Sequence, residues 1–335
     1  MPRLAISRVN PLEHAEEIKQ LFLAEERPEF PEFFDRAYRD AVAAGGMSWI
    51  GRDEWGTVRS HIALFPHQFL LAGRVVRGSL LANLMVAKSH RAFWPAHALV
   101  RRAVQDSKAS RSVDFLYADP NEPARAITHA AGFRSVAELR RFVLPLTDRR
   151  RSIDLVIRLY LLIGRLRARA TPLEVTAWGD REPPALPDHP THARDARFLR
   201  PVRGAGLYRA RLPGYPGPTD CWYTVHARDL PVANALVRGP ERPGGQAVIC
   251  ALECQSTPLV SSVLLSLACR LQRAGVPRLE AWVTVDSRAA TEARRVGFVP
   301  RHDRIPLMAL PITELGAEAI AAAPEWRLVL IDLDR

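Results

Sequence analysis

The apolar and polar residues of the first 146 positions alternate in ways that predict strands and helices in mixed order. Apolar residues recur at helical spacing after Pro11, and glycines bound the extended segments further on. The predicted elements are a strand at 4–9, helices at 12–26 and 31–44, strands at 48–53, 58–73 and 75–86, a helix at 95–107, a strand at 112–118, a short helix at 123–131 and a strand at 139–146.

The later part of the chain has fewer clear patterns. Residues 183–220 are rich in Pro, Gly, His and Arg, which predicts irregular structure. After this stretch the pattern predicts strands at 222–228, 234–239 and 247–254, a long helix at 258–275, a strand at 279–285, a short helix at 288–296 and a last strand at 304–311.

A repeat relates the two halves. Residues 113–146 and 279–311 both follow the order strand, turn, short helix, Gly-Phe and strand, and a long predicted helix precedes each. Asn121 lies eleven residues before Gly132, as Asp286 does before Gly297. This order predicts an α/β protein with two copies of one domain, each a mixed, mostly antiparallel sheet flanked by helices. The expected division is a first domain at 1–146, a linker helix at 147–175 and a degenerate second domain at 176–335.

Composition narrows the classes of function. The 335 residues are 47% hydrophobic and 25% charged, with a net charge of +11. Arginine supplies most of the excess and suits a polyanionic cofactor, nucleic acid or an anionic membrane, although an arginine-rich coding bias explains it equally well. The four cysteines lack the paired spacing of a zinc site, so we expect no metal. No secretory h-region and no 20-residue apolar span are seen, which predicts a cytoplasmic protein.

The stretch LMV-x-x-x-HR at 84–91, followed by a helix, resembles the cofactor motif of the GNAT (Gcn5-related N-acetyltransferase) superfamily. Asn121 and the Gly-Phe pair after the next strand fit the same pattern. The resemblance is clear for about 1–146 and weaker for about 176–335. It implies a bulged strand that splays from its neighbour, with acyl-CoA inserted between the two. It also implies a loop, R/Q-x-x-G-x-G/A, that cradles the pyrophosphate at a helix N-terminus.

By this resemblance the residues that bind acetyl-CoA or another acyl-CoA are Met85, Val86, Arg91, Ala92, Trp94, Ala96 and Asn121. Arg91 matches the first loop position and Ala96 is an accepted substitute for the last glycine. Trp94 replaces the other glycine, and its indole would fill the space beside the phosphates unless it rotates away. The sequence therefore predicts weak CoA binding, and a closed site on a retained fold is the alternative.

The catalytic positions implied by the resemblance are also altered. Asn83 stands where many members carry a carboxylate base, and it can only orient a water. Thr128 stands where many carry the tyrosine that protonates the leaving thiolate. The adjacent His129 is a further candidate for an acid, but a surface or packing role is more common for such a residue. In the second half, Glu253 at a strand end is the best carboxylate candidate, with simple solvation as the alternative.

Residues 149–169 combine seven arginines with an almost wholly apolar centre. A linker helix packed between the two domains is the favoured interpretation. A helix with basic ends and an apolar centre would also suit weak contact with an anionic membrane surface.

The resemblance predicts an acyl-CoA-dependent N-acyltransferase that acts on a small-molecule or peptide amine. The alternatives are a catalytically inactive binding or scaffold protein built on the same fold, and an arginine-rich binder of membranes or nucleic acid. The nucleic-acid alternative lacks the interleaved aromatic residues of single-strand binders.

Overall fold

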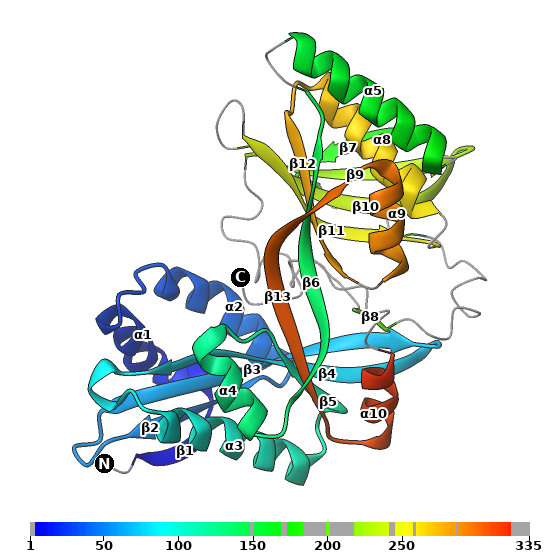
Figure 1. The fold of residues 1–335 in the computed structure, drawn as a ribbon. Helices are drawn as coiled ribbons and strands as arrows, with labels where there is room; N and C mark the ends of the chain where they lie inside the picture. Colours follow the sequence, from blue (N-terminus) through cyan, green and yellow to red (C-terminus); the bar gives the residue numbers. More distant parts are fainter. Residues whose placement is uncertain are drawn as a thin grey trace.

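The fold centres on one long mixed sheet that runs through two lobes (Figure 1). The computed structural model describes residues 4–147, 151–168, 173–181, 183, 186, 199–201, 218–240, 245–256, 259–285 and 287–322. Its strands follow the order β1-β2-β3-β4-β5-β13-β6-β12-β11-β10-β9-β7, and the short β8 pairs with β3. Among the described strands, only β4 with β5 and β11 with β12 pair in parallel. The mixed α/β fold predicted from the sequence is confirmed.

The first lobe is formed mainly by the chain up to residue 145, and its elements agree closely with the predicted ones. They are β1 (Ala5–Val9), the 3-10 helix η1 (Pro11–His14), α1 (Ala15–Ala24), α2 (Phe30–Ala43), β2 (Met47–Arg52), β3 (Val58–Leu71), β4 (Arg74–Val86), η2 (Lys88–His90), α3 (Phe93–Ser110), β5 (Phe115–Ala118), α4 (Glu122–Ala130) and β6 (Arg134–Pro145).

Among the described elements of the second part of the chain, the apolar pattern missed β7, β8 and α10. The elements are α5 (Arg151–Ala168), β7 (Glu174–Gly179), β8 (Leu199–Pro201), β9 (Asp220–Ala227), β10 (Leu230–Arg238), β11 (Gln246–Cys254), α8 (Val260–Arg273), β12 (Arg278–Thr284), α9 (Arg288–Val296), β13 (Val299–Pro311) and α10 (Glu314–Ala321). Most of the segment 183–220, expected to be irregular, lies outside the described residues.

The predicted repeat is visible in the order of the elements. The series β4–α3–β5–α4–β6 corresponds to β11–α8–β12–α9–β13. Asn121 accepts a hydrogen bond from the backbone N–H of Ala124 and caps α4, while Ser287 caps α9 in the same way. Asp286, which the sequence pattern had aligned with Asn121, lies outside the described residues.

The two halves exchange strands at the centre of the sheet. β13, from the end of the chain, lies between β5 and β6 of the first half, and β6 in turn pairs with β12. Both strands run from one lobe to the other in Figure 1. Leu307 belongs to the core of the first lobe, whereas Phe298, just before β13, belongs to the core of the second. The division at 146 and 176 stays a prediction, and β13 contributes to the first lobe in any case.

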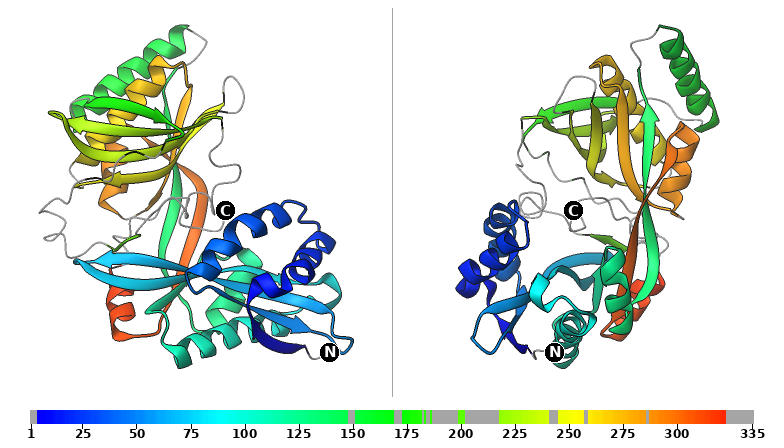
Figure 2. Two further views of the ribbon diagram at one scale, coloured as in Figure 1. Left: turned by 180° about the vertical axis from the view of Figure 1, so that it is seen from behind. Right: turned by 60° about the vertical axis from the view of Figure 1, so that its left-hand side comes forward.

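The expectation that the linker helix is packed between the two lobes is wrong. α5 lies on the outside of the second lobe, against α8 and α9, in both views of Figure 2. Ile157 and Leu161 are its buried apolar residues, and the Tyr160 hydroxyl donates to the carbonyl oxygen of Gly297 at 2.8 Å. A Cβ at Gly164 would lie 2.2 Å from the carbonyl oxygen of Val296, so glycine allows the close approach of α5 to α9.

Replacing a buried residue of β13 tests the strand exchange. Leu307 is fully buried in the first lobe's core, and Leu307→Ala should lower the free energy of unfolding by about 2–5 kcal/mol. Hydrogen exchange should rise in β4 and β5, although the substitution lies late in the chain. The control is Val299→Ala, at a half-exposed position of the same strand, which should cost less than about 1 kcal/mol. Faster exchange confined to the second lobe would contradict the strand exchange.

Candidate functional site

Strands β4 and β5 separate soon after they begin to pair. Their parallel pairing covers only Gly78–Leu80 against Phe115–Tyr117, although β4 continues to Val86. The Asp114 carboxylate fixes the paired end, because it accepts hydrogen bonds from the backbone N–H and side chain of Arg77 and from the Thr313 hydroxyl. Burial raises the pKa of Asp114, but these hydrogen bonds outweigh the burial and hold it below its ordinary value.

A bulge occurs in β4 where the two strands diverge. The register of β3 against β4 shifts between His61, opposite Met85, and Ala63, opposite Ala82, so Asn83 and Leu84 together face a single residue of β3. Asn83 has a φ of +56°, in the left-handed region that asparagine tolerates better than most residues. The backbone thus turns at the position where the cleft opens.

A cavity of about 530 Å³ lies at the divergence of β4 and β5. Residues of β4, β5 and the segment after it, α4, and the region from α1 to α2 surround it. Its apolar lining includes Phe22, Phe30, Phe33, Ile62, Leu81, Leu84, Met85 and Val100. Its charged lining is Arg27, Glu29, Glu32, Arg36 and Asp119. The cavity therefore combines an apolar floor with a rim that carries charges of both signs. The three carboxylates of this rim outnumber its two guanidinium groups.

A buried histidine holds the bulge in place. Nδ1 of His61 lies 3.1 Å from the carbonyl oxygen of Asn83, and Nε2 lies 3.1 Å from the Ser48 hydroxyl. Since a carbonyl oxygen can only accept, Nδ1 carries the hydrogen and Nε2 accepts from Ser48. Burial lowers the pKa of His61 to about 4, so the ring is neutral at pH 7. The Asn83 side chain also donates to the Tyr38 hydroxyl at 2.9 Å, which links the bulge to α2.

A carboxylate of the protein itself, that of Glu25, already binds the loop between β4 and α3. Glu25, at the end of α1, accepts from the backbone N–H of Lys88 at 2.8 Å and from the Arg91 guanidinium at 2.7 Å. The Glu25 side chain is only 6% exposed. Arg91 is therefore paired with Glu25 and would have to release it, or share it, to contact a phosphate. No side chain caps the N-terminus of α3 at Ala92, and the first turn contains no acidic residue.

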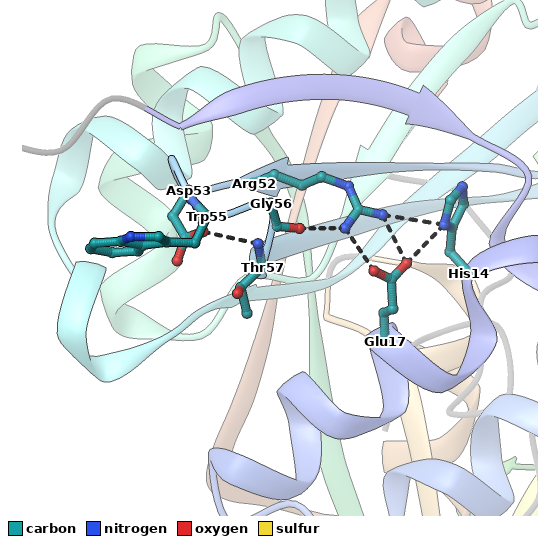
Figure 3. Close-up of polar contacts among 7 residues, drawn as sticks. All are labelled: His14, Glu17, Arg52, Asp53, Trp55, Gly56 and Thr57. Carbon is teal, nitrogen blue, oxygen red and sulfur yellow. Dashed lines mark hydrogen bonds and ion pairs between the residues drawn. The ribbon is translucent and has the colours of Figure 1, made fainter.

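An ion cluster positions α1 over the sheet (Figure 3). The Arg52 guanidinium of β2 donates to both carboxylate oxygens of Glu17 at 2.7 and 2.8 Å, and His14 lies 2.9 Å from the same carboxylate. The hydrogen bond from Arg52 is the main cause that lowers the pKa of Glu17 to about 2. The adjoining turn is closed by Asp53, which accepts from the backbone N–H groups of Trp55 and Thr57. These contacts fix the start of α1, which Glu25 directly follows.

Trp94 points away from the cavity and does not block it. Its side chain is 64% exposed, packs edge-on against Phe93 and His97, and is absent from the cavity lining. Ala96 is buried in the first turn of α3, where a larger side chain would disturb the packing.

The other residues proposed from the sequence divide into those at the cavity and those away from it. Asn83, Met85, Asn121 and Thr128 all line the cavity. Thr128 is buried, and its hydroxyl donates to the carbonyl oxygen of Ala124 at 2.7 Å, so it is not placed to donate to a leaving thiolate. The residues outside the lining are Val86, which is buried, Ala92, which is half-buried, and His129, which is exposed.

Glu253 lies in the other lobe and does not meet the first cleft. It is half-buried in β11 and faces Asn234 of β10 in the register. A second divergence occurs here, because β11 pairs with β12 only over Gln246–Ile249 and then shifts register against β10.

Several residues of the cleft were missed from the sequence. Glu25, Glu32 and Tyr38 belong to the helices predicted at 12–26 and 31–44. Glu29 lies between these helices, and none of the four residues carried a motif of its own. His61 lies in a predicted strand, where a single histidine gives no signal of its contacts. Groups of three or more His, Cys, Asp or Glu that could hold a metal ion do not occur among the residues with described positions. None of the described helices is long and apolar enough to cross a membrane.

Comparison with solved structures identifies the fold. A GCN5-related N-acetyltransferase from Anabaena variabilis ATCC 29413 has a TM-score of 0.64 at 12% identity, with 93% of this chain and 74% of that chain covered. Another from Kribbella flavida has a TM-score of 0.62 at 13% identity, with 93% and 73% covered. Eis1 from Mycobacterium abscessus has a TM-score of 0.58 at 13% identity, with 92% and 73% covered. No family model and no curated protein matches the sequence. The chain has the GNAT fold, as its resemblance predicted.

The neutral His61 should make the protein sensitive to acid. Its pKa is about 4 when folded and about 6.5 in an unfolded chain, so the unfolded state binds protons first as pH falls. The neutral ring therefore contributes at most about 3 kcal/mol to the free energy of unfolding. This contribution is fully present above pH 6.5 and is lost as the pH falls to 4. His61→Leu should be less stable at pH 7, because Asn83 and Ser48 lose a partner, yet should lose less stability between pH 6.5 and 4.

Urea denaturation at four pH values across this range measures the difference. The other titrating groups are common to both proteins, so the difference between the two curves isolates His61. Equal slopes for the two proteins would show that His61 is not held neutral.

Proposed function

We propose that the first lobe binds acyl-CoA in the cleft between β4 and β5 and transfers the acyl group to an amine. The observation that carries this proposal is the divergence of two parallel strands at the Asn83 bulge, with a cavity between them. The GNAT fold of the solved structures supports it. The acyl donor we propose is acetyl-CoA or a related acyl-CoA, and the expected compartment is the cytoplasm.

The exposed edge of β4 suits the pantetheine arm. Beyond Leu80 no described strand pairs with this edge, so its backbone N–H and C=O groups can bind the amides of an extended ligand as a neighbouring strand would. A backbone N–H near Met85 or Val86 would polarise the thioester carbonyl as negative charge develops on its oxygen. The apolar floor of the cavity would exclude water from the acyl chain.

The phosphates would bind at the start of α3, near Arg91. The uncapped backbone N–H groups of this turn and the helix dipole favour an anion. Glu25 competes for Arg91, so the affinity should be lower than in a loop whose arginine is unengaged. The indole of Trp94 is exposed and lies outside the cavity lining. Competition from Glu25 is therefore the physical cause that we propose for weak binding.

The carboxylates of the cavity rim define the acceptor side. An amine is cationic near pH 7, and Glu29, Glu32 and Asp119 would attract it. In the reaction the amine loses a proton to one of these carboxylates or to water, and its nitrogen attacks the thioester carbonyl. The nitrogen gives up a second proton to water as the carbon–sulfur bond breaks, and CoA leaves as a thiolate that takes a proton from solvent. Asn83 would position the acceptor or a water, since it cannot accept a proton.

A binding protein without turnover is the second candidate. The engaged hydroxyl of Thr128 favours it, because the position that would supply an acid offers no proton to the leaving group. Binding of CoA alone would be common to both candidates, so thioester cleavage in the presence of amines is what separates them.

Filling the cavity should abolish CoA binding. Ala124 lines the cavity from α4, whereas Ala126 on the same helix is exposed and outside the lining. Ala124→Trp should weaken CoA binding at least about tenfold, because an indole would occupy space that the ligand needs. Ala126→Trp is the matched control and should bind CoA like the unmodified protein. Isothermal titration with CoA and acetyl-CoA measures both. Equal affinities for the two variants would place the ligand elsewhere.

Removing the Thr128 hydroxyl should leave the rate of acyl transfer almost unchanged. Thr128→Val keeps the shape of the side chain and deletes a hydroxyl that already donates to Ala124. Thiol release from acetyl-CoA with a panel of amines measures kcat/KM. We expect a change of less than about threefold, whereas loss of a general acid typically costs 10²–10⁴-fold. A fall of that size would assign Thr128 a chemical role, and no thiol release in the unmodified protein would favour the binding function.

A further inference from the structure

One face of α5 packs on the second lobe, and the opposite face is covered by no described residue. Ile157, Tyr160, Leu161 and Gly164 face α9. The exposed apolar side chains on the other face are Leu155, Val156, Leu159, Leu162, Ile163 and Leu166. Their spacing of three and four residues places them along one stripe of the helix, about 16 Å long. Each is between 37% and 69% exposed, so the stripe is a continuous apolar surface in contact with water.

The segment is also rich in arginine. Positions 151, 158 and 165 are arginine and are spaced seven residues apart, which places these backbone positions in one row of the helix. Four further arginines occur at 149, 150, 167 and 169, and Asp154 is the single acidic residue between 149 and 169. An arginine-rich segment with an aliphatic stripe has the composition of a helix that lies in the interface of an anionic bilayer.

We propose that α5 binds the protein to an anionic lipid surface. The helix would lie flat, with the leucines and isoleucine in the acyl region and the arginine head groups among the lipid phosphates. Both views in Figure 2 place α5 at the end of the molecule remote from α1 and α2, so the lipid surface would lie far from these two helices. The proposal is thus independent of what the cavity binds.

The charge distribution favours lipid over a second copy of the chain. Two copies of α5 that pack through their stripes would run parallel or antiparallel. Because arginines occur at both ends of the segment, either direction brings arginine against arginine with few carboxylates to offset them. An anionic bilayer satisfies the apolar stripe and the arginines at once.

Vesicle co-sedimentation tests the proposal. The unmodified protein should sediment with phosphatidylcholine vesicles that contain phosphatidylglycerol, less with phosphatidylcholine alone, and should be released by salt. Leu159→Glu combined with Leu162→Glu should weaken this binding by at least about tenfold, since charge replaces apolar area at the centre of the stripe. Both positions are at least half exposed, so the thermal unfolding temperature should not fall. The control Leu230→Glu, at a 66% exposed leucine outside α5, should bind like the unmodified protein.

Three results would overturn the proposal. The first is absence of the unmodified protein from the pellet of anionic vesicles. The second is equal binding by the double variant and the Leu230→Glu control. The third is a dimer in light scattering that the double variant converts to a monomer while vesicle binding is absent, which would assign the stripe to a second copy of the chain.

Discussion

The Asp114 carboxylate is the contact on which the arrangement of the first lobe depends. Its side chain binds Arg77 of β4 and Thr313 after β13, and its carbonyl oxygen accepts the N–H groups of Ile312 and Thr313. Three strands distant in sequence are thereby held together at one end. Because β5 has only four residues, pairing cannot extend far from this fixed end. The divergence of β4, and the cavity that follows from it, is a consequence of a short strand held firmly at its start.

The bulge converts this divergence into a defined site. A straight β4 would continue to pair in register with β3 and present a different face to the cavity. The neutral His61 takes up the carbonyl oxygen that the bulge displaces, and Tyr38 receives the Asn83 amide. The resemblance aligns Asn83 with a catalytic carboxylate that this chain lacks. In the structure, Asn83 has a structural role at the bulge. A buried polar network of this kind is stable only when its members are satisfied, which explains the neutral histidine.

Much of the fold was predictable because the apolar pattern of this chain is local and regular. The first-lobe helices and strands, and the strand–helix–strand repeat, follow from periodicity, glycines and caps. The exchange of β13 was not predictable, because pairing between strands distant in sequence leaves no trace in the spacing of either. The predicted position of α5, between the two lobes, was wrong for a related reason. Its apolar residues cover most of the helix circumference, and sequence alone cannot tell which face meets protein.

The site was predictable where a motif fixes the backbone and not where side chains meet across the fold. Met85 and Asn121, which the resemblance to the GNAT motif named, both line the cavity. Glu25 was missed, since its contact with the loop spans more than sixty residues. The orientation of Trp94 depends on its neighbours Phe93 and His97 and could not be read from spacing.

The strand exchange also has a consequence for synthesis on the ribosome. A chain grows from its N-terminus, and domains generally fold as units as they emerge. Here β5 has no partner on one side until β13, residues Val299–Pro311, has been made. The open edge of β5 and the apolar residues that β13 covers therefore stay exposed until residue 311 has been synthesised. The nascent first lobe is therefore a candidate client for chaperones that shield exposed strand edges.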